Sequence, residues 1–87
     1  MTKTYRGVSW NRRDCAYRVK VKHDGRHYNF GYHEDPVYAA KIFDAVVAAL
    51  RGPDASTNFF PPKPPNDMTM AQVHRMMRSK GLEPRFS

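Results

Sequence analysis

Residues 17–32 of the chain are YRVKVKHDGRHYNFGY, and this stretch decides the fold. Apolar and cationic side chains alternate from Tyr17 to Lys22, which is the period-two pattern of a strand with one buried face. The pair Asp24-Gly25 comes next, and Asp-Gly is typical of the two-residue turn of a β-hairpin. The alternation then resumes, with Tyr28, Phe30 and Tyr32 expected on the buried face and His27, Asn29, Gly31 and His33 on the other. The stretch therefore predicts an antiparallel hairpin with one cationic face.

A further strand and a long helix flank this hairpin. Residues 5–10 (YRGVSW) are a shorter strand candidate, and residues 11–14 (NRRD) supply a polar turn. Asp35 and Pro36 mark the start of a helix, because an Asp side chain accepts from first-turn amides and proline fits the first helical position. Gly52 and Pro53 mark its end. The predicted core consists of the helix face Val37, Ala40, Phe43, Val47 and Leu50, together with Ala55, Phe59 and Phe60.

The remaining residues predict a linker and a second helix. Residues 61–65 (PPKPP) are too rich in proline for a helix or a central strand. Thr69 and Gln72 then form a capping-box pattern, and Gly81 ends the helix. Its apolar side is Met70, Val73, Met76 and Met77, and its basic flank is His74, Arg75 and Arg78. We expect an α+β fold: a three-stranded antiparallel sheet packed on one long α-helix over residues 4–60, a Pro-rich linker at 61–66, and a basic amphipathic helix and tail at 67–87.

Composition limits the class of protein. The chain has 87 residues, a net charge of +7 and a single cysteine, Cys15, so it contains no intrachain disulfide. It has no apolar run of the roughly 20 residues that a membrane span needs, and no signal peptide is recognised, which predicts a soluble intracellular protein. Cys15, His23 and His27 lack the fourth ligand of a closed zinc site. No acid/base pair or phosphate-binding loop indicates an enzyme, so we expect no catalytic residue, metal, cofactor or small-molecule substrate.

The excess positive charge is concentrated in residues 1–35 and 61–87. Residues 1–35 carry eight basic and four acidic side chains, residues 36–60 two of each, and residues 61–87 five and two. The sheet face turned away from the helix should carry Arg6, Arg18, Lys20, Lys22, His27 and Asn29. Such a face favours a polyanionic partner, because the cations repel one another unless an anion compensates them. The alternative interpretation is an exposed lysine-rich face that keeps the protein soluble and protects sheet edges.

Double-stranded DNA is the polyanion that fits a narrow β-element, because its major groove is about 12 Å wide and presents distinct base edges. We assign base contacts to Arg6, Arg18, Lys20, Lys22 and Asn29, and phosphate contacts to Arg12, Arg13 and Arg26. Trp10 has two interpretations, a groove-facing aromatic or a core residue with the parity of Val8. RNA is less favoured because the strand aromatics have core parity. The alternative function is a protein-interaction module that uses the Met-rich C-terminal helix, with non-specific nucleic-acid binding.

Several motifs also match a known family. Tyr5-Arg6-Gly7-Val8, Asp44, Arg51-Gly52-Pro53-Asp54-Ala55 and Asn58-Phe59 resemble, in order and spacing, the Apetala-2/ethylene-response-factor DNA-binding domain of plant transcription factors. The resemblance covers about residues 4–60. It implies a three-stranded sheet on one helix, with the sheet inserted in the major groove, and a nuclear protein that regulates transcription.

The resemblance also implies a set of DNA contacts. The family's groove-facing positions fall on Arg6, Arg18, Lys20, Lys22, His27 and Asn29. Ser9 and Trp10 lie near the first turn, where members of that family often have arginines and a tryptophan. The resemblance therefore adds Ser9 and Trp10 to the expected interface. Lys20 replaces a frequent glutamate and Asn29 a usual tryptophan, so no DNA sequence is carried over from the family. Residues 61–87 lie outside the resemblance, and a chain without them is expected to fold and bind DNA.

Overall fold

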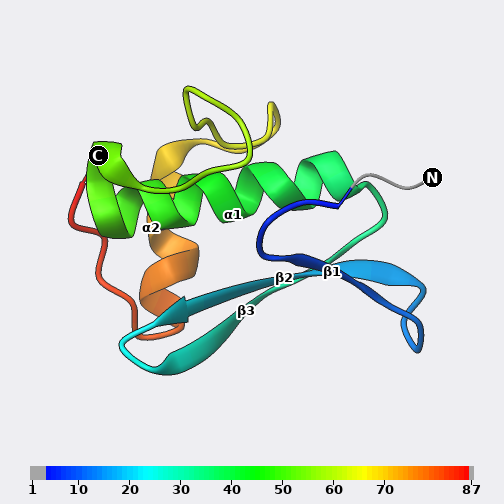
Figure 1. The fold of residues 1–87 in the computed structure, drawn as a ribbon. Coiled ribbons are helices and arrows are strands. Elements are labelled where there is room, and N and C mark those ends of the chain that lie inside the picture. Colours follow the sequence, from blue (N-terminus) through cyan, green and yellow to red (C-terminus); the bar gives the residue numbers. More distant parts are fainter. Residues whose placement is uncertain (1–3, 87) are drawn as a thin grey trace.

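Three strands and two α-helices make up the described part of the chain, residues 4–86 of a computed structural model (Figure 1). Strands β1 (Val8–Asn11), β2 (Ala16–His23) and β3 (Arg26–His33) pair antiparallel in the order β1-β2-β3. Helix α1 spans Pro36–Arg51, a 3-10 turn follows at Gly52–Asp54, and α2 spans Met70–Ser79. Both helices lie on the same side of the sheet in Figure 1. The predicted α+β fold class is confirmed.

The central hairpin forms as its sequence predicts. Asp24 and Gly25 have φ angles of 52° and 76°, and both central residues of a type I′ turn need positive φ. The first strand is shorter than predicted, because it begins at Val8 and residues 5–7 precede it. The first turn covers residues 12–15 instead of 11–14, because Asn11 still pairs with Ala16 in the ladder.

Helix α1 begins and ends at the predicted residues, but its burial is different. The Asp35 carboxylate accepts a hydrogen bond from the Val37 amide at 2.9 Å, and the Gly52 amide donates to the Ala48 carbonyl. The buried residues of α1 are Ala39, Ala40, Ile42, Phe43, Asp44, Ala45, Val46, Val47, Ala49 and Leu50, whereas Val37 is only half-buried. They cover more than the single face that was predicted, so the sheet cannot be the only element packed on α1.

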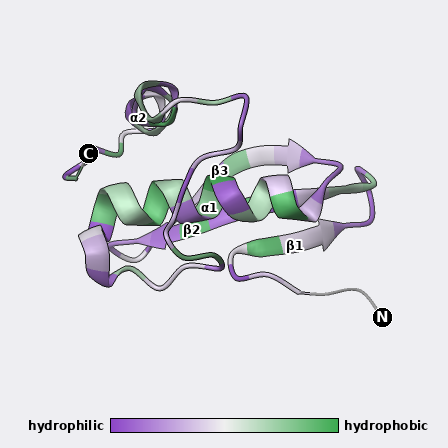
Figure 2. Cartoon of the chain, turned by 90° about the horizontal axis from the view of Figure 1, so that it is seen from above, coloured by the Kyte–Doolittle hydropathy of each residue, from purple (hydrophilic) through white to green (hydrophobic). Residues whose placement is uncertain are grey.

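The second side of α1 is covered by α2 and the C-terminal tail. Thr69 Oγ1 accepts from the Gln72 amide at 3.2 Å, and Gln72 Oε1 accepts from the Thr69 amide at 2.8 Å, so the predicted capping box is present. Val73 and Met77 are fully buried, and together with Leu82 they belong to the same hydrophobic core as the sheet and α1. Figure 2, seen from above, shows α2 nearly end-on beside α1. One core therefore spans the segments that the sequence separates at residues 61–66.

The proline-rich segment is packed against the domain at its end. Residues 62–65 have no helix or strand, as predicted, but Pro65 is fully buried. Tyr38 of α1 donates a hydrogen bond to the Asp67 carboxylate at 3.0 Å. Burial and the neighbouring Asp67 raise the pKa of Tyr38.

A buried carboxylate joins three segments that lie far apart in the sequence. Asp44 of α1 is fully buried and accepts hydrogen bonds from the amides of Asn58 at 2.7 Å and Phe59 at 2.8 Å. The Asn58 side chain accepts from the Arg6 amide at 2.6 Å and donates to the Arg6 carbonyl at 3.0 Å. Backbone groups that would otherwise be unpaired are satisfied in this way. The sequence singles out Asp44 and Asn58 only through the family resemblance, without a role for either.

Phe60 was predicted in the core, and this prediction is wrong. Its side chain is 87% exposed, whereas that of Phe59 is half-buried, with its ring centroid 5.7 Å from that of Tyr5. Asp44 holds the amides of residues 58 and 59, which fixes the orientation of the chain there. The chain bends at residues 58–61, so Phe60 does not follow Phe59 into the core.

Candidate nucleic-acid interface

The pairing of the strands places most of the predicted contact residues on one face. Ser9 lies opposite Arg18, Lys20 opposite Asn29, and Lys22 opposite His27. Residues directly opposite each other in an antiparallel pair have side chains on the same face. The intervening residues Val19, Val21 and Phe30 are buried beneath α1. We call the side turned away from the helices the outer face, and it comprises Ser9, Arg18, Lys20, Lys22, His27, Asn29 and Tyr32.

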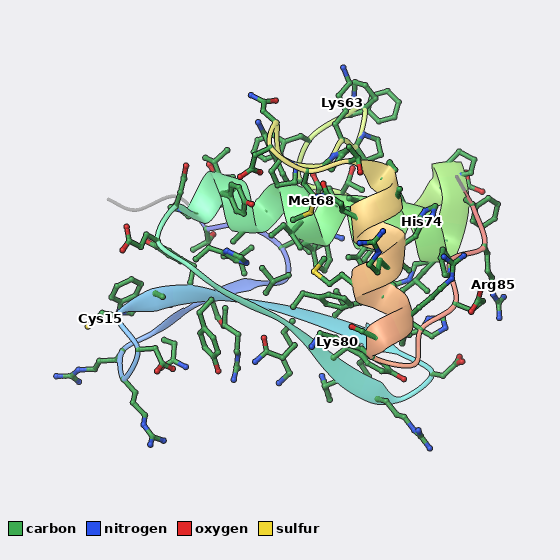
Figure 3. The ribbon with its side chains drawn as sticks, turned by 180° about the vertical axis from the view of Figure 1, so that it is seen from behind. Cys15, Lys63, Met68, His74, Lys80 and Arg85 are labelled. Carbon is green, nitrogen blue, oxygen red and sulfur yellow. The ribbon has the colours of Figure 1, made fainter. Side chains whose placement is uncertain are left out.

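The outer face is open and carries no negative charge. Ser9, Lys20, Lys22, His27 and Asn29 are exposed, and Arg18 is half-buried. The three strands contain no aspartate or glutamate. Figure 3 shows side chains that end in nitrogen projecting from the sheet, on the side away from both helices. Ser9, Lys20, Lys22 and His27 also line one shallow depression of about 330 Å³.

The predicted phosphate-contacting arginines lie at the two ends of β2. Arg12 and Arg13 are exposed in the turn before β2, and Arg26 is exposed immediately after the hairpin turn. Asn11 stabilises the first turn, because its side-chain oxygen accepts from the Arg13 amide at 3.0 Å and the Asp14 amide at 3.3 Å. A strand of eight residues is about 26 Å long at 3.3 Å per residue. The arginines therefore flank the outer face at both ends.

A β-bulge in β3 changes the faces that were predicted for its last residues. Arg18 pairs with Tyr32 while Lys20 pairs with Asn29, so Val19 alone lies opposite the two residues between them. The extra residue reverses the alternation. Tyr32, predicted in the core, is 44% exposed on the outer face, and His33, predicted on the outer face, lies on the helix side with its ring 5.1 Å from that of Tyr38. Gly31 within the strand was the available signal for a bulge.

The bulge also orients the side chain of Asn29. Its Oδ1 accepts from the Gly31 amide at 2.8 Å, and its Nδ2 donates to the Tyr32 hydroxyl at 3.3 Å. An asparagine amide offers two acceptor sites and two donor hydrogens, so one of each remains for a ligand. The Asn29 amide is thus held in one orientation with a free donor beside a free acceptor.

Arg6 does not join the outer face. It lies in the turn that precedes β1, where its guanidinium donates to the Ser56 hydroxyl and its backbone is bonded to Asn58. It lines a separate depression with Thr57 and Asn58. The next residue, Gly7, packs so closely on α1 that a Cβ there would overlap the Phe43 ring. That close contact directs the chain across the helix, and the prediction of Arg6 within the first strand is wrong.

Trp10 fits neither of its two interpretations. It pairs with Tyr17 on the helix side of the sheet, with the ring centroids 5.0 Å apart, so it shares the parity of Val8 and does not face outward. It is nevertheless 54% exposed. Trp10 and Tyr17 line a cavity of about 580 Å³ together with Pro36, the first residue of α1. Of the described residues that line this cavity, Pro36 alone belongs to α1, so the helix covers little of the indole.

No family model matches the chain, and no curated protein matches it. Within residues 4–86, no three His, Cys, Asp or Glu side chains are grouped closely enough to hold a metal ion. In the same range, neither helix is long and apolar enough to cross a membrane. Cys15 is exposed in the first turn, and its thiol lies 3.6 Å from the Arg12 carbonyl.

Proposed function

We propose that the chain binds double-stranded DNA sequence-specifically, with the outer face of its sheet in the major groove. The observation that carries this proposal is an uncovered sheet face that gathers Arg18, Lys20, Lys22, His27 and Asn29 and contains no acid. Cations held together without counterions favour a polyanion. The resemblance of residues 4–60 to the Apetala-2/ethylene-response-factor domain supports DNA over other polyanions, and a role as a nuclear transcription factor or its DNA-binding domain.

The dimensions of the sheet suit the major groove. A β-element enters a groove about 12 Å wide, and β2 at about 26 Å is longer than this width, by the usual rise per residue. When the middle of β2 lies in the groove, its ends reach the sugar-phosphate backbones on either side. Arg12 and Arg13 at one end and Arg26 at the other then contact phosphates, which fixes the register without reading sequence.

The residues in the middle of the outer face are the ones that would contact the bases. Arg18, Lys20 and Lys22 present donors suited to guanine N7 and O6. The free donor and acceptor of Asn29 suit the N7 and N6 atoms of adenine. Arg6 is removed from this set because its guanidinium is bonded to Ser56. Trp10 is removed because it lies on the helix side.

Salt dependence tests the binding mode. Three phosphate contacts predict that log affinity falls with log salt concentration with a slope of about −2.7 or steeper, at about −0.9 per contact. The measurement is fluorescence anisotropy of a labelled duplex at four salt concentrations. A flat dependence contradicts the proposal. Lys63→Ala, which removes a cation from the proline-rich segment, should leave the slope unchanged.

Two substitutions separate base reading from phosphate contact. Asn29→Ala should reduce discrimination at one base pair by about 1–3 kcal/mol, whereas Arg13→Ala should weaken all sequences alike and make the salt slope shallower by about 1. Tyr32→Phe should lower discrimination at the same base pair by a smaller amount, because it removes the hydroxyl that accepts from Asn29. The measurement is selection of bound duplexes from a random pool, followed by affinities for every single-base variant of the site. Equal effects of Asn29→Ala and Arg13→Ala would refute the assigned roles.

The alternative function, a protein-interaction module that uses the Met-rich helix, receives less support. Val73 and Met77 of α2 are fully buried in the core of the domain. The apolar side of that helix is therefore occupied within the chain itself.

A further inference from the structure

A groove lies on the surface of α1, outside the sheet. It has a volume of about 740 Å³, and its lining is mostly apolar. Small residues of α1 and the residue after it form the floor: Ala45, Ala48, Ala49 and Gly52. Phe60 and Phe86, which are 87% and 45% exposed, line it from the proline-rich side and the tail side. Pockets of about 300–1,000 Å³ are the size that drug-sized ligands occupy.

The groove is built from segments that the domain holds in place. The amides of Arg85 and Phe86 both donate to the Ala49 carbonyl, at 2.8 and 3.0 Å. The Phe86 ring packs on Gly52, where a Cβ would lie 2.8 Å from its Cζ. On the other side, the hydrogen bonds of Asp44 to residues 58 and 59 fix the chain just before Phe60. Two aromatic side chains therefore remain partly exposed to water above a floor of small residues. This exposure of apolar surface is unfavourable in free energy unless a partner covers it.

The charged side chains that line this groove are positive. They are Lys63 and Arg85, and none of the described residues that line it is acidic. Figure 3 shows Lys63 at the top of the molecule, far from the sheet, and Arg85 at its side. Neither side chain forms an ion pair with any residue between 4 and 86. An apolar floor with cations at the rim is complementary to a segment that combines apolar and acidic side chains.

We propose that this groove binds a short acidic-apolar peptide segment of a protein partner. One large apolar side chain of the segment enters between Phe60 and Phe86, over the alanines of α1. Carboxylates on either side of it pair with Lys63 and Arg85. This surface is distinct from the Met-rich face of α2, since only Met70 of that helix lines it. The groove also lies outside the outer face of the sheet, so the partner and DNA are bound at the same time and neither proposal depends on the other.

Selection from a displayed library of random dodecapeptides tests the proposal on the full chain. We expect the enriched peptides to combine a large apolar residue with two or more acids. A synthetic copy of an enriched peptide should shift amide signals of residues 45–52, 60–64 and 85–86 in a ¹⁵N-HSQC spectrum. The double substitution K63E/R85E should weaken its binding by about tenfold or more, as should Phe60→Ala. Phe60, Lys63 and Arg85 are all exposed, so these variants should fold normally.

A matched variant separates a specific groove from general attraction to a basic protein. R12E/R13E makes the same change in net charge, but in the turn between β1 and β2. It should leave peptide binding unchanged and weaken DNA binding. The proposal is overturned if the enriched peptides lack acidic residues, or if R12E/R13E weakens peptide binding as much as K63E/R85E. It is also overturned if sedimentation shows a dimer that Phe60→Ala abolishes, because the groove then belongs to a second copy of the chain.

Discussion

A chain truncated after Asn66 should lose its cooperative thermal unfolding transition. The truncation removes Val73, Met77 and Leu82, which are at most 3% exposed and share one core with the sheet and α1. Burying a side chain of this size stabilises a fold by about 1.5–3 kcal/mol, so the loss is about 5–9 kcal/mol. That amount is comparable with the whole free energy of unfolding of a small domain, about 5–15 kcal/mol. Circular dichroism melting and the dispersion of an HSQC spectrum measure the outcome.

Point substitutions make this prediction specific. Met77→Ala should lower the free energy of unfolding by about 2–5 kcal/mol, because it leaves a cavity in the core. Arg75→Ala is the matched control in the same helix, because its exposed side chain should change stability by no more than about 0.5 kcal/mol. A truncated chain with the melting temperature of the full chain would show that α2 contributes nothing to the core. The shared core reverses the expectation from the sequence that a chain without residues 61–87 folds and binds DNA. Because the truncated chain is expected to unfold, its DNA binding cannot separate the two proposed functions, and substitutions on each surface are the better experiment.

Reversing the charge of two outer-face lysines should strongly weaken the proposed specific DNA binding. Lys20 and Lys22 are exposed on neighbouring outward positions of β2. Each base contact is worth about 1–3 kcal/mol, so K20E/K22E should lose about 30-fold in affinity at the least, since about 1.4 kcal/mol is tenfold. Repulsion between the new carboxylates and the phosphates adds to this loss. Anisotropy titration of the selected duplex measures it.

The control is K63E/R85E, which changes the net charge equally but outside the sheet. It should alter DNA affinity only slightly, because exposed charges farther than a Debye length of about 8 Å are largely screened at physiological salt. If the two double variants lose affinity equally, the protein binds DNA through its overall charge and the major-groove proposal is wrong. The melting temperatures of both variants should stay close to that of the unchanged chain, since all four side chains are exposed.

The sequence predicts those features of this protein that depend on neighbouring residues. Alternation over residues 17–22, the Asp24-Gly25 turn, the Asp35 cap and the Thr69 capping box each act within a few positions, and each is present in the structure. The pairing of Lys20 with Asn29 and Lys22 with His27 follows from the hairpin turn, so the central part of the candidate interface could be predicted.

The tertiary structure decides the features that depend on contacts between distant segments. Arg6 leaves the interface because Asn58 and Ser56, about fifty positions later, hold it. Trp10 stays exposed because α1 covers little of it, and α1 is buried on two sides because α2 packs on it. Periodicity shows which side chains share a face, but not which faces other segments will cover. Which faces are covered depends on the path of the whole chain. The register also depends on distant pairing, since a single extra residue in β3 turns Tyr32 outward.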